Sequence, residues 1–548
     1  MTKKSVVRKI TYSLLGVLIV LVLACWLFFT FYFQNFVNAH LNTKLKEATL
    51  TSTHGLFRLE VGKVQYANGS LYCTRVELIR TRYDSSESGL TVKYLIADSV
   101  HFQGLHLLDL LRGKGLFLER LSAASPQIFI GDAATGREEL RKSKQDTTPF
   151  SSTMPKGMPV ISYDKINLPN ISLHIPVGFT PRGVDTLYRG IGINLRDLRI
   201  DDSVLRKQPV LFCKGVDLTM KNFPFGVTDS NYSLNIVGIH ASFEDSIITV
   251  DSFSFKPKYS EEVFASKYRY ATPRLSFHCF GIRLDGINFG NSLSQGTVTV
   301  RKFVVSSFDL DSYEDHLRPK NPHPNPVMFP NEMIGAFPGR LTIDSFIIDK
   351  GRIRLRERWK GGTGVLGFDK VRISASPIIN DSANKMTEKR AKITIDALFI
   401  GEAPLKAELY YFLSHKTFDM DARATLGSFS ALKLNPWLIP VERMKVKSGV
   451  FHKGTIDMTI RAGKAITKVV PLYRDFLVNI LPADPHQKSG FAEKIKTFAV
   501  STFVIRSNNP NGLGSTKIGL TEYPRIGTEQ FFQYLWLAIR KSLEKVVG

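Results

Sequence analysis

Apolar and polar residues alternate over much of the chain after residue 50, a period of two that is typical of β-strands with one covered and one solvated face. The pattern is clearest at 341–348 and 352–357, which flank Asp349-Lys350-Gly351 and predict a β-hairpin. Similar runs recur at irregular spacing, so we expect hairpins and meanders rather than a solenoid of fixed period. Strand should exceed helix by at least about two to one. The other predicted strands are 192–201, 211–220, 247–255, 280–289, 296–310, 371–376, 391–400, 403–413 and 450–460.

Helical periodicity is confined to a few segments. Residues 36–50 and 105–112 are predicted to form short helices, and 471–481 begins with a proline that the first turn of a helix accepts. The clearest helix is predicted at 528–547, with an apolar stripe that we expect to pack on the β-rich domain, while binding to a membrane surface is the alternative. The stripe consists of Phe532, Leu535, Trp536, Ile539, Leu543, Val546 and Val547.

The N-terminal segment is predicted to be a membrane anchor. Residues 1–9 carry four basic residues, and 10–43 carry no charge, with the most apolar run at 14–33. Such a run is long enough for a helix to cross a bilayer, and the basic tip places the N-terminus in the cytoplasm. A cleaved signal peptide is the alternative, but it has a shorter apolar core and small residues at the cut. The residues expected in the anchor include Leu14, Leu21, Trp26 and Phe33.

Two polar segments are predicted to be linkers, because Ser, Thr, Pro and Gly are common in the first and six prolines occur in the second. The expected organisation is a tip at 1–9, an anchor at 10–34, β regions at 35–140, 161–315 and 339–485, linkers at 141–160 and 316–338, and a tail at 486–548.

Charge narrows the class of partner. The net charge is +24, which favours anionic partners such as lipid headgroups, and export makes nucleic acid the least expected of them.

Cys73, Cys213 and Cys279 are widely spaced and form neither a disulfide framework nor a zinc pattern. The glycine motif at 362–367 matches a dinucleotide fingerprint, yet a strand-like run follows where that fingerprint needs a helix. We therefore expect no catalytic residues, metal or cofactor.

The segment 105–130 resembles the AsmA family. An apolar stretch at 107–111, a basic and glycine turn at 112–115, and an apolar strand at 116–121 lead to Pro126-Gln-Ile-Phe-Ile130. The N-terminal order of a basic tip, a single helix and a strand at 55–61 also resembles that family. The segment 446–481 resembles the C-terminal part of many AsmA-like proteins. The resemblance implies an inner-membrane anchor and a curved periplasmic β-groove, related to the bridge-like lipid transfer proteins. It also implies a role in outer-membrane homeostasis through phospholipid movement, without catalytic residues.

The sequence thus predicts a mainly β protein: a single transmembrane helix, a curved antiparallel β-groove and a C-terminal amphipathic helix. Its expected partners are phospholipid or another acyl lipid, the inner membrane and an outer-membrane or envelope protein. The alternatives are an envelope scaffold that assists outer-membrane protein assembly and an exported glycan hydrolase. The residues expected to line the lipid groove are Leu341, Ile343, Val298 and Val300.

Overall fold

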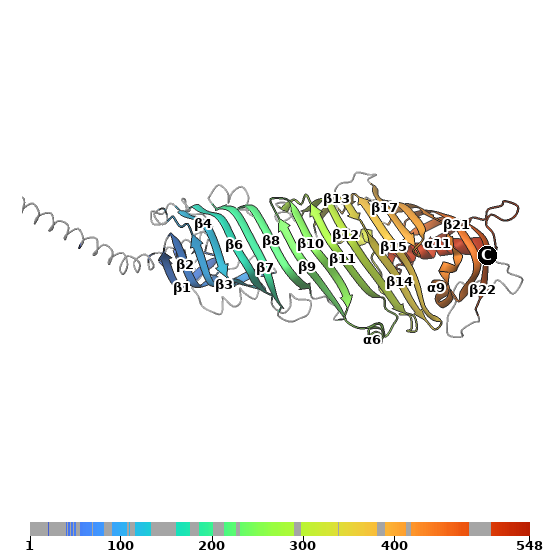
Figure 1. Cartoon of the computed structure of the whole chain (residues 1–548), viewed down its shortest axis with the longest axis horizontal. Coiled ribbons are helices and arrows are strands. Elements are labelled where there is room, and N and C mark those ends of the chain that lie inside the picture. The colour runs from blue at the N-terminus through green and yellow to red at the C-terminus, as the bar shows by residue number, and fades with distance from the viewer. Residues whose placement is uncertain are drawn as a thin grey trace, which may run out of the picture. The chain divides into compact units, whose positions relative to one another are not determined.

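The computed structural model (Figure 1) describes residues 20, 40, 42–43, 45–47, 49–50, 55–67, 69–81, 90–106, 109, 115–132, 160–175, 186–200, 213–225, 231–289, 297–337, 339–380, 390–412, 418–481 and 506–547. Strands make up 65% and helices 14% of the described residues, so the prediction of a mainly β protein is confirmed. The chain divides into two compact units, Met1–Lys221 and Asn222–Gly548. We call them the N-terminal unit and the C-terminal unit and describe each by itself.

The N-terminal unit is a mixed sheet. β1, β2 and β3 pair antiparallel in chain order, and β3 then pairs with both β4 and β5. β6 runs parallel to β4 and β5, and β7 and β8 follow antiparallel. The strands are β1 (Phe57–Ala67), β2 (Ser70–Arg80), β3 (Leu90–Gln103), β4 (Gly115–Ala124), β5 (Gln127–Asp132), β6 (Val160–Ile175), β7 (Thr186–Ile200) and β8 (Cys213–Phe225), the last of which contains the boundary between the units.

The C-terminal unit has the longer run of strands. Neighbours in space follow chain order from β9 to β23, and most pairs are antiparallel. The strands are β9 (Tyr232–Ser242), β10 (Ile247–Pro257), β11 (Arg274–Asp285), β12 (Thr297–Asp315), β13 (Arg340–Ile348), β14 (Gly351–Trp359), β15 (Gly362–Ser376), β16 (Ile378–Ile379), β17 (Arg390–Phe399), β18 (Ala403–Phe412), β19 (Met420–Leu426), β20 (Phe429–Ser430), β21 (Met444–Arg461), β22 (Lys464–Ile480) and β23 (Gly519–Pro524). The helices are α6 (Glu261–Ser266), α8 (Pro330–Gly335), η2 (Ala431–Leu434), α9 (Asn435–Trp437), η3 (Leu438–Glu442) and α11 (Phe531–Val547).

The predicted hairpin around Asp349-Lys350-Gly351 is wrong. β13 and β14 lie end to end, and both run parallel to β12, with Val305 opposite Ile348 and Phe308 opposite Gly351. The chain continues past Asp349 and Lys350 in the same direction and in the same register with β12 instead of reversing, and the alternation on either side looks the same in both cases. The expectation of a purely antiparallel sheet is corrected with it, because β12 to β13 and β5 to β6 are parallel steps. Parallel neighbours need long connections, and segments 133–159 and 316–339 are these connections.

The predicted helix at 471–481 is also wrong, since these residues belong to β22 or directly follow it. Alternate residues of β22 are buried up to Tyr473, and a bulge with Asp475 at φ 53° then changes the phase. Leu472, Phe476 and Ile480 are four residues apart, a spacing that occurs in a strand of period two as well as on one face of a helix. By contrast, α11 confirms the predicted C-terminal helix, and the described residues between 40 and 50 are helical as expected.

The predicted transmembrane segment lies outside the described residues except for residue 20, and this includes Leu14, Leu21, Trp26 and Phe33. Within the part of the chain that the structure describes, no helix has both the length and the apolar character needed to cross a membrane. Most of the predicted helix at 105–112 and most of the linker at 141–160 also lie outside it.

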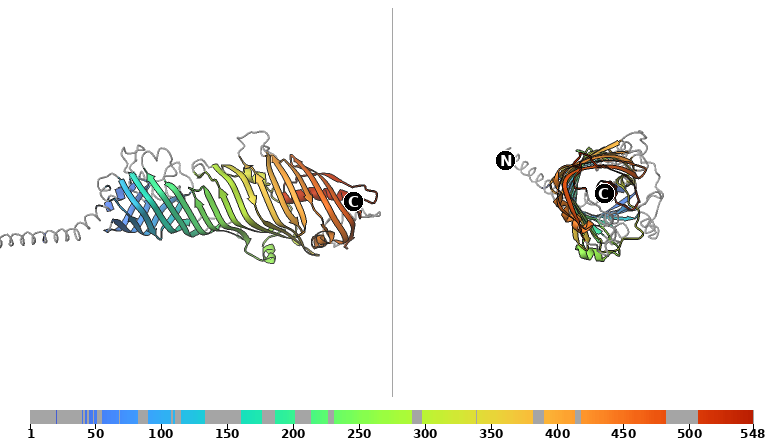
Figure 2. Two further views of the ribbon diagram at one scale, coloured as in Figure 1. Left: turned by 45° about the horizontal axis from the view of Figure 1, so that its top comes forward. Right: turned by 90° about the vertical axis from the view of Figure 1, so that its right-hand side faces the viewer.

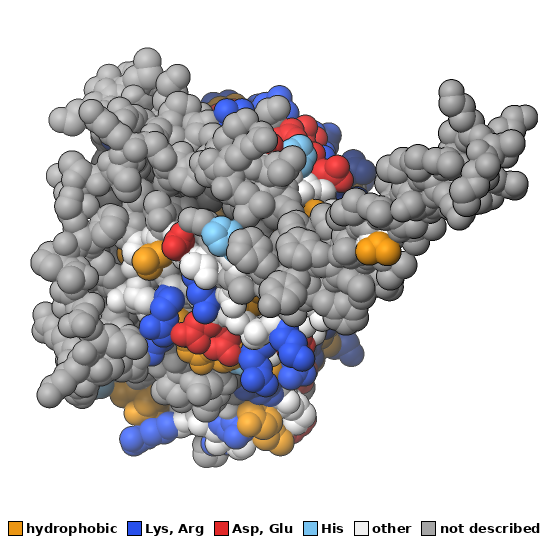
Figure 3. All heavy atoms as spheres, turned by 90° about the vertical axis from the view of Figure 1, so that its left-hand side faces the viewer, with side chains coloured by type: hydrophobic (Ala, Val, Ile, Leu, Met, Phe, Trp, Pro, Cys, Tyr) orange, Lys and Arg blue, Asp and Glu red, His pale blue; other side chains and the backbone are white. Residues whose placement is uncertain are grey.

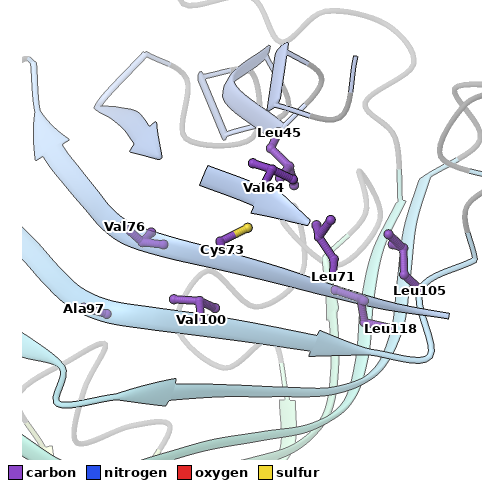
Figure 4. Packing of buried hydrophobic residues seen from close by; sticks show 9 residues of the cluster. All are labelled: Leu45, Val64, Leu71, Cys73, Val76, Ala97, Val100, Leu105 and Leu118. Atoms are coloured by element: carbon purple, nitrogen blue, oxygen red, sulfur yellow. The ribbon is translucent and has the colours of Figure 1, made fainter. Parts of the chain in front are cut away.

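One face of the N-terminal sheet carries the core of that unit. Figure 4 shows Val64, Leu71, Cys73 and Val100 from β1, β2 and β3 on this face, with Leu45 of the preceding helical segment packed over Val64. Leu45 is buried, so the helical segment covers the β1 end of the face. The segment therefore belongs to the folded N-terminal unit.

In the C-terminal unit the sheet is curved, and α11 lies inside the curve (Figure 2). Tyr534 and Ala538 of α11 are buried against Leu409, Met420 and other apolar side chains of β18 to β22. We call the face of the sheet that α11 contacts the inner face, and the opposite face the outer face. The position of α11 fixes which residues of each strand belong to the inner face.

Candidate functional site

The inner face of the C-terminal unit carries two continuous rows of side chains that run across its strands. Residues paired in register lie on the same face of a sheet, so each row can be followed from strand to strand. The first row is Ile239, Val250, Ile282, Val305, Ile348, Ile373, Ile395, Ala407, Ala424, Ile456 and Val469. The second row is Ala241, Ile248, Leu284, Phe303, Phe346, Ala375, Ile393, Leu409, Ala422 and Met458, and it ends at Thr467 and Thr521.

Every residue of these rows is apolar until the second row reaches the two threonines beneath α11. Ser542 of α11 donates to the backbone oxygen of Thr467 at 2.8 Å, and its hydroxyl lies 2.7 Å from that of Thr521. Ser542 thus partners the Thr521 hydroxyl, whereas the buried Thr467 hydroxyl has no hydrogen-bond partner among the described residues. Elsewhere the rows offer hydrocarbon only, because the backbone groups of the strands bond to one another.

Many of these side chains are only partly covered. Ile282, Ile348 and Ile373 are half-buried, whereas Val305 between them is buried. They belong to a cluster that spans β10 to β18 and whose described members all come from strands. Among the described residues, the cover provided by α11 is confined to the β17 to β23 end. In the described part of the chain, α11 thus leaves the β9 to β15 part of the two rows uncovered, while α9 and η3 contact β14 and β15 beyond the rows.

The outer face has the opposite character. Lys392 and Glu408 pair at 2.9 Å across β17 and β18. Arg423 and Asp457 approach to 3.6 Å across β19 and β21, with both side chains more than half exposed. Exposed pairs of this kind contribute little stability, but they keep the outer face wet. The outer face of the sheet is therefore charged and exposed to water, and only the inner face offers an apolar surface to a hydrocarbon chain.

The structure brings together the four residues predicted to line a groove. Val298 lies opposite Leu341, and Val300 lies opposite Ile343, in the parallel pair of β12 and β13. All four belong to one cluster with Phe303 and Phe346 of the second row. The cluster consists of Ile287, Val300, Ile343, Ile248, Leu284, Phe289, Val298, Phe303, Leu341, Phe346 and Ile378. Between Ile343 and Phe346 the parity of the clustered residues changes, while the register of β13 with β12 stays the same.

Val300 and Ile343 are nevertheless buried, at 1% and 8% exposed, because the segment after β11 places Ile287 against them. Val300 and Ile343 are therefore core residues of this part of the sheet. The half-buried row residues, among them Ile282, Ile348 and Ile373, are more accessible, and the sequence did not single out these three. Alternation identifies the apolar parity of each strand, but the register that aligns the strands into rows cannot be read from it.

A polar cluster lies where β12 and β14 end. His316 stacks on Trp359 at 4.3 Å between ring centroids, and its Nε2 lies 3.3 Å from Glu357 and 3.7 Å from Glu314. Burial, followed by the charge of Glu357, raises the pKa of Glu314 above its usual range, while the charge of His316 opposes that shift. Nearby, Arg356 pairs with Asp311 and with Glu261 of α6. The pair with Glu261 fastens α6 to the sheet, and the pair with Asp311 joins β14 to β12.

No group of His, Cys, Asp and Glu side chains suited to a metal ion occurs among the described residues. The glycine motif at 362–367 lies in β15, and Gly364 faces Val441 and Trp437 of the short helices. The motif is itself strand and not a loop, and the same strand continues through 368–374, where the sequence predicted a strand.

The N-terminal unit repeats the pattern of an apolar row. Its members come from successive strands and are again joined by register: Tyr66, Leu71, Phe102, Leu121, Ile166, Leu195 and Val216. Charged side chains of both signs also lie together in this unit: the Arg196 guanidinium of β7 lies 3.3 Å from the Asp217 carboxylate of β8. Figure 3 shows one face of the molecule, on which Lys and Arg lie beside Asp and Glu.

Comparison with known proteins adds no family assignment. No protein-family model matches the chain, and no curated protein sequence matches it. The resemblance to the AsmA family therefore rests on the sequence motifs at 105–130 and 446–481, and the geometry of the inner face is the evidence from which a function can be proposed.

Proposed function

We propose that this chain is a non-enzymatic lipid-binding protein that holds phospholipid acyl chains on the inner face of its C-terminal unit, as part of phospholipid movement for outer-membrane homeostasis. The observation that supports this proposal is the pair of continuous apolar rows, which run from β9 to β22 and are only partly covered. In a closed sheet sandwich, a second layer would bury such rows.

The chemistry of the rows favours an acyl chain over a peptide. A peptide brings backbone donors and acceptors that need partners when they are buried. The inner rows provide side chains such as Ile282, Ile348 and Ile373, which cannot act as partners. An acyl chain has no such groups, and covering hydrocarbon contributes about 0.8 kcal/mol per CH₂.

The anchor and the location belong to the same proposal. A transmembrane helix at 10–34 with a cytoplasmic tip would hold the described units on the periplasmic side of an inner membrane. The net charge of +24 suits anionic headgroups, which can stay in water at the margin of the apolar face.

The test compares two aspartate substitutions at neighbouring positions of β15. Ile373 lies in the first inner row, while Ser374 lies on the outer face and is exposed. Full-length wild type, I373D and S374D are purified from membranes in the same detergent, and the bound lipids are quantified by mass spectrometry. A carboxylate against hydrocarbon is costly, so we expect I373D to lose lipid while S374D retains the wild-type amount.

Thermal unfolding of each variant shows whether it is folded. Equal lipid on folded I373D and S374D would exclude the inner face as the binding site. Wild-type protein that never retains phospholipid would exclude the proposed function itself.

A further inference from the structure

The surface of α11 carries two different apolar faces. The face against the sheet is made of Tyr534, Ala538, Ser542 and Val546, all completely buried. These residues are four apart, so they form one line along the helix. Small residues in this line let the helix approach β23 so closely that a Cβ at Gly519 would clash with the backbone oxygen of Ser542.

Phe532 and Trp536 lie on the opposite side. Each is two residues from a buried member of the line, a rotation of about 200° around the helix. Phe532 is 67% exposed and Trp536 is 43% exposed. Because α11 lies inside the curve of the sheet, this side points away from the strands that α11 covers (Figure 2). Two large aromatic side chains are thus presented next to the inner face.

The flanks of α11 connect this aromatic pair to the inner rows. Leu535 and Ile539, which lie between the two faces, pack in the same cluster as Ile393 and Ile395 of β17. Ile393 and Ile395 are members of the second and first rows. Apolar surface therefore continues without a polar break from the rows, around the side of α11, to its exposed aromatic pair.

We propose that Phe532 and Trp536 form a subsite for the acyl chain of a bound phospholipid, so that α11 contributes to the lipid-binding wall as well as to the core. This inference rests on the proposed function and assigns α11 a part in it. The occupant is a hydrocarbon chain because the subsite continues the hydrocarbon surface of the rows. The Phe532 ring has no hydrogen-bonding group. The Trp536 side chain has one, the indole N–H, which it can offer to a headgroup or to water.

Tryptophan fluorescence tests the contact directly. The full chain is prepared with Trp26, Trp359 and Trp437 changed to Phe, which leaves Trp536 as the single tryptophan. The matched control carries W536F as well as Y410W, because Tyr410 lies on β18 next to inner Leu409 but on the outer face. Both proteins are mixed with phosphatidylglycerol brominated on one acyl chain, or with the same unbrominated lipid, in the same detergent.

We expect brominated lipid to quench Trp536 and to leave the tryptophan at 410 unchanged. Quenching of both by the same amount would show general contact with detergent and would overturn the subsite. Absence of quenching at Trp536, while mass spectrometry finds lipid on the same sample, would overturn the subsite and leave the proposed function standing. Absence of lipid on the sample would instead count against the proposed function.

Two serine substitutions give a second readout. Phe532 is mostly exposed, so F532S should fold, and losing a covered Phe side chain should weaken phospholipid retention by roughly tenfold or more. The control is L520S on β23, since Leu520 is 63% exposed and lies on the outer face beside inner Thr521. Equal retention by F532S and L520S would overturn the subsite. A concentration-dependent dimer that F532S abolishes would show that a second copy covers the aromatic pair and would overturn it as well.

Discussion

The ring of Phe308 in β12 occupies the space beside Gly351 in β14, so that a Cβ added at position 351 would fall on ring atoms Cδ1 and Cε1. The two residues are register partners in the parallel pair of β12 and β14. Gly351 is not needed for a turn, because its φ is not positive. It is needed because the inner face is packed tightly where β13 passes into β14.

The G351A variant should therefore be destabilised. Overpacking a core costs about 1–3 kcal/mol, since the Phe308 ring or the backbone has to move. Chemical denaturation followed by circular dichroism would measure the loss. The control is G367A in neighbouring β15, where the closest atom to an added Cβ is the Ile353 oxygen at 3.8 Å. A G351A variant as stable as G367A would contradict the packing described here.

The hairpin wrongly predicted around Asp349 shows what the alternation of apolar and polar residues can and cannot predict. The alternation placed strands on both sides of Asp349 correctly, because each strand separates an apolar from a polar face. A strand that is interrupted for two residues and a chain that reverses give the same local pattern, however, so the parallel pairing of β13 and β14 with β12 was missed. The same applies to β22, where apolar residues four apart, such as Phe476 and Ile480, fit a strand as well as a helix.

The candidate site was predictable in part. The four residues chosen from sequence do lie together, yet Val300 and Ile343 are core because Ile287 packs on them. In α11, large side chains such as Trp536 suggested the packed face, whereas close approach to β23 requires small ones such as Ala538 and Ser542. Which side of a helix meets a sheet depends on the available space, and that is a tertiary property.

This difference between the sides of α11 leads to a prediction about stability. Ala538 is completely buried against the sheet, so A538F should lower the free energy of unfolding by at least about 2 kcal/mol. Trp536 is 43% exposed, so W536F should change it by less than about 1 kcal/mol. Denaturant unfolding of the two variants would compare them. A larger loss in W536F than in A538F would mean that α11 packs through its other side.

The connection between β12 and β13 is fastened to the C-terminal region by Glu332 and Arg525. Glu332 of α8 pairs with Arg525 at 2.9 Å and accepts from the backbone N–H of Phe329 at 2.6 Å. The Arg525 guanidinium also lies 3.5 Å from the centroid of the Phe329 ring. E332Q should cost about 1 kcal/mol, because Glu332 is partly exposed and solvent screens the ion pair.

The effect of E332Q should depend on pH. The hydrogen bond with Arg525 holds the pKa of Glu332 below its ordinary value of 4.5. A lowered folded-state pKa gives stability that is present above the unfolded pKa and lost as pH falls through the folded one. The melting difference between wild type and E332Q should thus be constant near neutral pH and shrink below about 4.5. The control is E522Q, whose side chain is 60% exposed and should matter less.

Two buried cysteines should report separately on the two units. Burial raises the pKa of Cys73, in the N-terminal unit, to about 12 and that of Cys279, in the C-terminal unit, to about 11. The thiolate is the reactive form, so both should react with iodoacetamide at pH 8 on the order of a hundredfold more slowly than in denatured chain. Peptide mass spectrometry after timed alkylation would give the rate at each cysteine.

The same pKa shifts fix the direction of the effect of alkaline pH on folding. Each thiol has a folded-state pKa above its ordinary 9.0, so the stability from keeping it protonated is complete below pH 9 and falls as the pH rises toward the folded value. Above pH 9, C73A should therefore lose less stability than wild type in the N-terminal unit, and alkylation of Cys279 should report the C-terminal unit independently. Rapid alkylation of Cys73 in native protein at pH 8 would mean that the core beneath Leu45 opens far more often than its burial implies, because a thiol that is 1% exposed can react only when the sheet around it opens.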